Sequence, residues 1–367
     1  RRLDLRFGVA YDSDIAKVKE ILQKALDEKV SDVFIVSGFP ISFKMGGNIV
    51  PINDEKLNYK DTQVLLENIY NLYENGNIQT LLSKGDDDFS FSIPGLSRFR
   101  VNAYRQRGSL AAVLRVVRFE LPNAKDMNIP EVVTELYQRQ KGLVLVTGPA
   151  GSGKTTTLAC IIDEINRNCR KHIITIEDPI EYIHPHKQSI VSQREIMLDT
   201  EGYAQALRAA LRQSPNVILL GEMRDFETIQ TALTAAETGQ LVFSSLHTVG
   251  AAKTVDRIVD VFPANQQQQI RIQLSMVLQA VVSQQLIPTV DGKLTPAFEI
   301  MLVNSAIRSL IRDGKVHQMD NVIYSSMDEG MITMDTDLLR LYKAGIISKE
   351  NALFYATNQD AMAKKLM

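Results

Sequence analysis

The first third of the chain alternates between two apolar periods. Residues 14–29 predict a helix, because apolar side chains recur on one face at Ile15, Val18, Leu22 and Leu26. Strands are predicted at 32–36, 41–45, 49–50, 88–93, 98–105 and 109–117, with a hairpin turn at Gly46-Gly47-Asn48 and a second helix capped by Asp61. Helices beside one antiparallel sheet predict a small α+β domain.

From Gly142 the apolar runs become continuous. They occupy 143–147, 173–176, 217–220 and 241–245, with helical patterns between them. Strands buried on both faces have this character, so the pattern predicts a parallel sheet with crossover helices. The uncharged run 272–290 contains glutamine and serine, and we interpret it as a buried amphipathic helix rather than a membrane span. Residues 298–367 are predicted to be mostly helical.

These textures predict two domains in the 367 residues. The N-terminal domain covers 1–118, a linker rich in turn residues covers 119–135, and the second domain with its helical C-terminal part covers 136–367. Charge adds one constraint, since a net charge of -2 gives no basic surface that would favour a nucleic-acid partner. Two cysteines, Cys160 and Cys169, form no disulfide framework and fit a reducing compartment; no signal peptide is recognised.

A phosphate-binding loop follows the run 143–147. The motif GxxxxGK[ST] is matched in full by Gly148-Pro149-Ala150-Gly151-Ser152-Gly153-Lys154-Thr155, and Thr156 continues into a helical pattern. Backbone N–H groups of such a loop and the helix N-terminus bind phosphate oxygens. Lys154 is expected to reach the outer phosphates and Thr155 to ligate Mg²⁺, so ATP and Mg²⁺ are the predicted ligands. A chance match is expected in about one chain in a hundred.

Three further candidates lie at the ends of predicted parallel strands. Glu177 follows 173–176, Glu222 follows 217–220, and His247 follows 241–245. Ligands of open parallel sheets bind at these ends, and a phosphate-loop site needs carboxylates for the metal and for water. The alternative is that the acids only cap turns and that the histidine is a satisfied core or surface residue. His184-Pro185-His186 is read as a loop, because no third metal ligand has a suitable spacing.

The hairpin over 98–117 carries one further hypothesis. With Arg107-Gly108 as its two-residue turn, Arg100 lies directly opposite Arg115 on a polar face, while the other face is wholly apolar. Like charges opposite each other destabilise a sheet, and an anion between them reverses this. We therefore expect an arginine clamp on ATP phosphate. The alternative is a solvated basic face neutralised by neighbouring acids.

The motifs together resemble those of the GspE/PilT secretion ATPases. The loop 148–155 is similar to their Walker A loop, 175–181 to their Asp box, 221–225 to their Walker B motif, 234–248 to their His box, and 98–102 to the arginine-bearing strand of their N-terminal domain. The resemblance implies a PAS-like N-terminal domain, a RecA-like motor domain and a homohexameric ring. It further implies that Glu177 polarises water and that Glu222 acts through Mg²⁺, directly or through water. His247, which ends a predicted parallel strand of the same sheet, is expected to sense the γ-phosphate or to relay its state.

Within this family, residues 306–313 resemble the AIRNLIRE motif of the retraction motors of type IV pili, with Ser309 and Asp313 as departures. Arg308 and Arg312 are expected to face outward from a helix whose apolar side is Ile307, Leu310 and Ile311. The resemblance implies pilus retraction and twitching motility, a cytoplasmic location at the inner face of the membrane, an inner-membrane platform protein as partner, and as a further partner a paralogous motor ATPase. Pilus assembly, type II secretion and an accessory ATP-binding subunit remain alternatives.

Overall fold

A computed structural model describes residues 14–45, 48–73, 76–117 and 121–366. The chain forms two compact units, one over residues 1–119 and the other over 120–367. Each unit contains both helices and strands.

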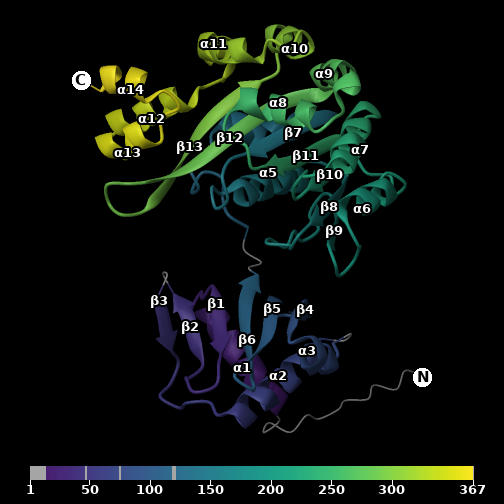
Figure 1. The fold of residues 1–367 in the computed structure, drawn as a ribbon, viewed down its shortest axis with the longest axis vertical. Coiled ribbons are helices and arrows are strands. Elements are labelled where there is room, and N and C mark those ends of the chain that lie inside the picture. The colour runs from purple at the N-terminus through teal and green to yellow at the C-terminus, as the bar shows by residue number, and fades with distance from the viewer. Residues whose placement is uncertain (1–13, 46–47, 74–75, 118–120, 367) are drawn as a thin grey trace. The chain divides into compact units, whose positions relative to one another are not determined.

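The first unit is a six-stranded antiparallel sheet with three helices (Figure 1). The strand order is β3-β2-β1-β6-β5-β4. The strands are β1 (Asp32–Ile35), β2 (Ser42–Met45), β3 (Asn48–Pro51), β4 (Asp86–Ile93), β5 (Ser97–Gln106) and β6 (Ser109–Val117), and the helices are α1 (Asp14–Asp27), α2 (Tyr59–Leu72) and α3 (Ile78–Lys84). Its core joins the apolar face of the sheet to the helices, around Leu22, Leu66, Leu81 and Phe99.

The predicted hairpin register is confirmed. Gln106 pairs with Ser109, and Arg100 pairs with Arg115. The apolar face is buried throughout, and it consists of Phe99, Val101, Ala103, Ala112, Leu114 and Val116.

The N-cap of α2 differs from the prediction, and the predicted turn between β2 and β3 is not described. Asn58, not Asp61, is the N-cap of α2, since its side chain accepts from the backbone N–H groups of Lys60 and Asp61. Asp61 is the third helical residue, and its carboxylate accepts from the Asn58 N–H at 2.7 Å to complete a capping box. The turn predicted at Gly46-Gly47 lies outside the described residues, although β2 and β3 pair as expected.

The second unit is built on a seven-stranded sheet of order β13-β12-β7-β11-β10-β8-β9. All neighbouring pairs are parallel except β12 with β13. The strands are β7 (Gly142–Thr147), β8 (His172–Glu177), β9 (Ile190–Glu195), β10 (Val217–Leu220), β11 (Leu241–Leu246), β12 (Leu278–Pro288) and β13 (Leu294–Leu302). The predicted parallel strands are therefore confirmed as β7, β8, β10 and β11.

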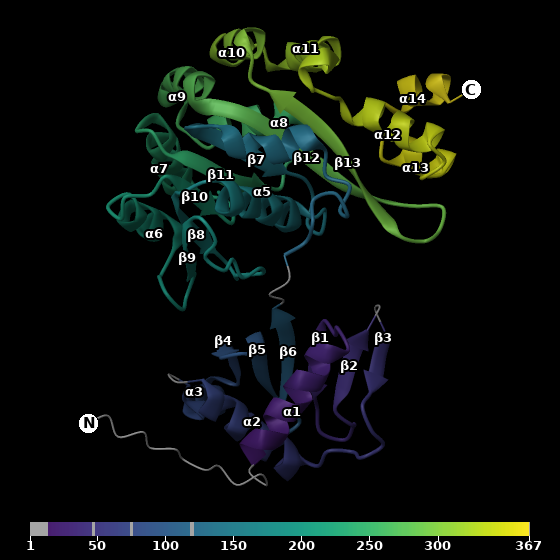
Figure 2. The same ribbon diagram turned by 180° about the vertical axis from the view of Figure 1, so that it is seen from behind.

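Helices cover both faces of this sheet (Figures 1 and 2). On one face lie α5 (Lys154–Asn168), α4 (Glu131–Thr134) and the 3-10 turn η1 (Glu135–Gln138). On the other lie α6 (Tyr203–Ala210), α7 (Phe226–Glu237), α8 (Ala251–Asp260), α9 (Ala264–Val277), α10 (Ser305–Arg312) and α11 (Met319–Ser325). The far end of the β12–β13 hairpin packs with α12 (Met334–Lys343), α13 (Lys349–Phe354) and α14 (Gln359–Lys365); η2 (Val316–Gln318) and η3 (Met327–Glu329) flank α11.

The interpretation of 272–290 as one helix was wrong beyond residue 277. The helix α9 ends at Val277 and the strand β12 begins at Leu278, next to β7 in the sheet. A strand buried on both faces shows no alternation, so periodicity does not separate it from a buried helix. A search of the described helices finds no segment with the length and apolar character of a membrane span.

Within the segment predicted as a linker, 119–135, the described residues 121–135 belong to the second unit. Ile129 and Val133 are buried in the core on the α5 face of the sheet. The backbone N–H of Ile129 donates to the carbonyl of Ala124 at 2.9 Å, which closes the turn that leads into α4.

Candidate nucleotide site

The phosphate loop joins β7 to α5 and contains two glycines with positive φ close to Gln284. Gly148 has φ +143, and a Cβ there would lie 2.1 Å from the backbone carbonyl oxygen of Gln284, so only glycine fits. Gly153 has φ +89, a conformation that favours glycine, and a Cβ there would lie 2.8 Å from the side-chain Nε2 of the same glutamine. The Ser152 hydroxyl of this loop is buried and has no hydrogen-bond partner among the described residues, a state that suits a phosphate ligand.

Lys154 is folded back onto the loop. Its Nζ donates to the carbonyls of Gly148 and Pro149, both at 2.9 Å, and the residue is buried. Burial lowers the pKa of this ammonium group, while Glu222 and Glu181 oppose that shift. The lysine is thus a cation already withdrawn from water, close to where phosphate oxygens would lie.

Glu177 ends β8 and is 6% exposed. Burial raises the pKa of its carboxyl group to about 7, although hydrogen bonds from Thr175 at 2.6 Å and Gln193 at 3.2 Å favour the ionised form. A carboxylate that titrates near neutral pH is well matched to the work of a general base.

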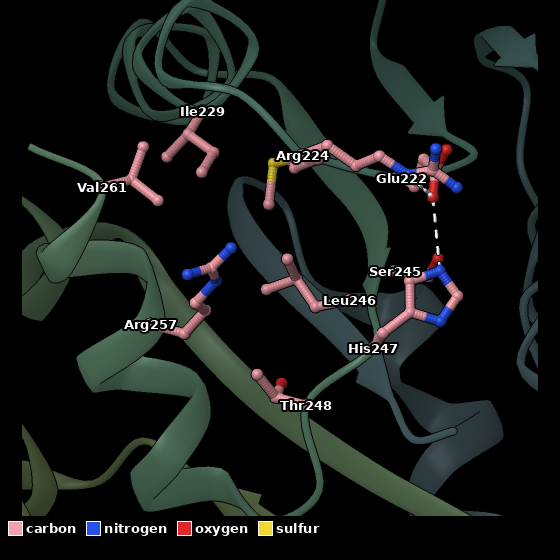
Figure 3. Close-up of a pocket in the computed structure, with 10 residues that line it drawn as sticks. Glu222, Arg224, Ile229, Ser245, Leu246, His247, Thr248, Arg257 and Val261 are labelled. Atoms are coloured by element: carbon pink, nitrogen blue, oxygen red, sulfur yellow. Dashed lines mark hydrogen bonds and ion pairs between the residues drawn. The ribbon is translucent and has the colours of Figure 1, made fainter. Parts of the chain in front are cut away.

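Glu222 follows β10, and one of its carboxylate oxygens has two nitrogen neighbours, from an arginine and a histidine. Oε2 accepts from Nε of Arg224 at 2.7 Å and lies 3.3 Å from Nε2 of His247 (Figure 3). Gly221 precedes it, and a Cβ there would lie 2.8 Å from the Tyr203 hydroxyl, so a larger residue would have to displace that side chain. The Ser245 hydroxyl donates to the carbonyl of Gly221 at 2.6 Å and so links β11 to this turn.

The structure brings half of the predicted site residues to the lining of one cavity of about 270 Å³ at the carboxyl ends of the parallel strands. Its lining includes Ala150, Gly151, Lys154, Thr155, Glu177, Glu222 and His247. Thr156 lies one residue further along α5, and its hydroxyl is 3.0 Å from that of Tyr182. A second cavity, of about 390 Å³, shares Glu222, Arg224, Ser245 and His247 with the first. Arg257 of α8 is directed into it (Figure 3).

Arg100 and Arg115 belong to the first unit, in a row of residues that crosses the sheet from strand to strand. The row is Lys44, Asp32, Arg115, Arg100 and Ser90. Nε of Arg115 is 3.1 Å from Oδ1 of Asp32, whose side chain is only 7% exposed. Arg115 therefore has an acidic partner within its own sheet, as the alternative interpretation of this basic face expected.

Sequence reasoning missed Gln193, Gln284 and Tyr203. The first two lie on strands that the pattern did not reveal, and Gln284 supports the loop further by accepting from the Thr157 hydroxyl at 2.7 Å. Tyr203 lines the cavity from the start of α6. His184 also lines it and is buried; burial lowers the pKa of its imidazole to about 4.

Comparison with known proteins places these features in a family. The family model described as Type II/IV secretion system protein matches residues 12–334. The type IV pilus retraction ATPase PilT of Pseudomonas aeruginosa is 45% identical over 91% of this chain and 96% of its own length. The type IV pilus ATPase PilU of the same organism is 38% identical over 92% and 88% of the two chains.

A crystal structure of the pilus retraction motor PilT with bound ADP has a TM-score of 0.86 and 47% sequence identity, and it covers 94% of this chain and 98% of that one. The predicted resemblance to the retraction-type members is thereby confirmed. Because the family model spans most of the chain and these relatives are similar to it over most of their length, the chain belongs to the Type II/IV secretion system protein family.

Proposed function

We propose that the protein is an ATPase motor that couples ATP hydrolysis to retraction of type IV pili. The observation that carries the proposal is the convergence of the phosphate loop, Glu177 and Glu222 on one cavity, in a chain alike over almost its whole length to a pilus retraction ATPase. The three groups supply the parts that phosphoryl transfer to water needs: a phosphate cradle, a water-positioning base and a metal ligand.

The residues divide the chemistry between them. The loop 148–155 with Thr156 binds the phosphates, and Lys154 faces the outer ones. Glu177 accepts a proton from the attacking water as its oxygen bonds to the γ-phosphorus and the bond to ADP breaks. His247, beside Glu222, is placed to respond to the presence of the γ-phosphate.

Thr155 and Glu222 are the residues that would hold Mg²⁺. Both line the cavity, and hydroxyl and carboxylate oxygens are donors that Mg²⁺ prefers. Arg224 and His247 both contact Oε2 of Glu222, so Glu222 would hold the ion, directly or through water, while these contacts orient its carboxylate. The ion, when bound, neutralises charge on the transferring phosphate.

Arg100 and Arg115, on a PAS-like domain spanning 1–118, are proposed as the arginines that contact ATP phosphate. The pair of Arg115 with Asp32 leaves Arg100 as the stronger candidate for a phosphate contact, because its cross-strand neighbours are Arg115 and Ser90 rather than an acid. A homohexameric ring in the cytoplasm, docked on an inner-membrane platform protein, is the assembly that the family resemblance implies.

Two other functions share the same site. Pilus assembly or type II secretion would use the same chemistry, and likeness to PilU admits a motor that works beside a paralogous ATPase. Deleting the gene separates these functions: loss of a retraction motor leaves cells with more pili and no twitching motility, loss of an assembly motor leaves them bald, and loss of a secretion motor leaves pili unchanged.

The ATPase proposal is tested with purified protein. Glu177→Gln keeps the size of the side chain and removes its basicity, so it should bind ATP with nearly normal affinity and lose most turnover. Fluorescent nucleotide binding and phosphate release measure the two properties. Near-normal turnover by Glu177→Gln would show that another group positions the water.

A further inference from the structure

Gln193 lies on β9, the strand next to Glu177. It stands opposite Thr175 of β8 in the parallel register. Its Nε2 donates to Oε1 of Glu177 at 3.2 Å and to the carbonyl of Tyr182 at 2.9 Å, while its Oε1 accepts from the backbone N–H of His184 at 2.7 Å. Both ends of the amide are engaged, so only one orientation satisfies all three bonds.

Thr175 donates to the same carboxylate oxygen. Its hydroxyl lies 2.6 Å from Oε1 of Glu177. Two donors on one oxygen fix the rotation of the carboxyl group, which leaves Oε2 to accept from a water molecule. Since a base works only within hydrogen-bond reach of the proton it takes, this restraint bears directly on hydrolysis.

We propose that Gln193 is a positioning residue for ATP hydrolysis, which holds Oε1 of Glu177 so that Oε2 meets the attacking water. The inference rests on the role proposed above for Glu177. It also explains why the residue is an amide: a carboxylate at 193 would place a second negative charge against Glu177, and an apolar side chain would leave the Tyr182 carbonyl and the His184 N–H without their partner.

Other charged groups surround Glu177 and are unchanged by replacing Gln193. Glu181, in the loop after β8, and Glu195, on β9, both favour its protonated form. Lys154 of α5, Asp178, and the pair Glu222 and Arg224 after β10 line the same cavity. Tyr182, His184, Tyr203 of α6 and His247 after β11 complete its titratable lining. A change confined to Gln193 therefore alters the hydrogen bonds of residue 193 and leaves these groups in place.

The test is the pH dependence of turnover in full-length Gln193→Met. A carboxylate base is active when ionised, so wild-type kcat should rise through about pH 7, the pKa of Glu177. Loss of a donor that favours the ionised form raises that pKa, so the acid limb should move up by about one pH unit. At pH 7 this leaves about one tenth of the base ionised instead of half, a fivefold loss of kcat that recovers at higher pH.

Further variants test whether the shift of the acid limb comes from the hydrogen bonds to Glu177. Gln193→Glu keeps the bond from His184 N–H and should give a larger shift. Thr175→Val should shift the limb in the same direction, and Thr175→Ser should restore it. Ser192→Ala is the matched control, since Ser192 points to the opposite face of β9, where its hydroxyl contacts His172 at 3.0 Å; it should leave the limb in place.

Nucleotide affinity should stay within about twofold in every variant, because Gln193 is assigned no contact with nucleotide. An unmoved acid limb in Gln193→Met and Gln193→Glu, or a loss of equal size at all pH values, would overturn the positioning role. Those results would leave the proposed base intact if Glu177→Gln is inactive. Retained turnover in Glu177→Gln would instead refute the assignment of Glu177 as the base.

Discussion

The ion pair between Arg115 and Asp32 allows the two roles of the arginine pair to be measured separately. The perturbations are Arg115→Gln and Arg100→Gln, which remove the same charge from two residues that stand opposite each other. Arg115→Gln leaves the buried Asp32 carboxylate with the Ser31 hydroxyl at 2.8 Å and without its cation. Arg100→Gln removes only a like charge next to Arg115.

The expected stabilities follow from exposure. An unmet charged acceptor costs about 1–3 kcal/mol, and because the Arg115 side chain is 66% exposed the lower end applies, about 1 kcal/mol. Relief of a like-charge pair is worth about 0.2–1 kcal/mol, so Arg100→Gln should be neutral or slightly stabilising. A difference of 1 kcal/mol is about fivefold in an opening equilibrium.

Amide hydrogen exchange of the full chain is the assay, read in β1 and β6. Exchange should be about fivefold faster in Arg115→Gln and unchanged or slower in Arg100→Gln. Asp32→Asn combined with Arg115→Gln should cost less than the sum of the two single changes. Equal acceleration in both arginine variants would refute the assignment of the ion pair. A fall in ATPase activity with unchanged exchange in Arg100→Gln would mark Arg100 as the phosphate contact.

Other predictions concern the loop and the assembly. Gly148→Ala should abolish nucleotide binding, because its Cβ would collide with the backbone of Gln284. In Gly151→Ala the Cβ meets nothing within 4 Å, so the variant should lose only about 1 kcal/mol of loop stability because of the positive φ. Isothermal titration with ADP compares the two variants. Lys154→Ala should weaken ATP binding at least tenfold by removing a buried cation, and binding within twofold of wild type would contradict this. Light scattering with a non-hydrolysable ATP analogue should give six times the chain mass, and a monomer in every nucleotide state would exclude the ring.

The nucleotide cavity was largely predictable because its residues obey local rules. The phosphate loop is contiguous, and Glu177, Glu222 and His247 each follow a strand that its composition reveals. Parallel strands end at one edge of a sheet, so strand ends far apart in sequence come together without any knowledge of side-chain contacts. The register of the β5–β6 hairpin was predictable for a similar reason, since a two-residue turn fixes every pair that follows it.

Gln193 and Gln284 were not predictable by these rules. Each is a polar residue in a strand whose pattern is ambiguous: β9 is short and mostly polar, and β12 continues an uncharged run that begins in α9. Their partners, Glu177 and Thr157, lie on other elements, and only the order of strands in the sheet brings them together. Such contacts are set by tertiary packing, which periodicity along one segment does not contain.

In the helix α10 the apolar residues lie largely as predicted, whereas one of the two arginines does not. Its buried side was assigned correctly for Ile307 and Ile311, and Leu310 is partly buried. The expectation that both arginines face outward was wrong for Arg308, whose guanidinium donates to the carbonyls of Ser275 and Met276 at 3.4 and 3.3 Å.

These two carbonyls end α9, where the helix dipole is negative and carbonyls lack helical partners, so Arg308 has a structural role there. The spacing of residues along one helix predicts the direction of a side chain, but it does not predict that the end of another helix lies beside it. Arg312 is exposed, and its guanidinium contacts Ser309 and Asp313 of its own segment, while its backbone carbonyl accepts from Nε2 of Gln268 at 3.2 Å. A double replacement would therefore disturb α9 together with any partner surface, whereas Arg312→Ala alone isolates the surface through which α10 could act on retraction.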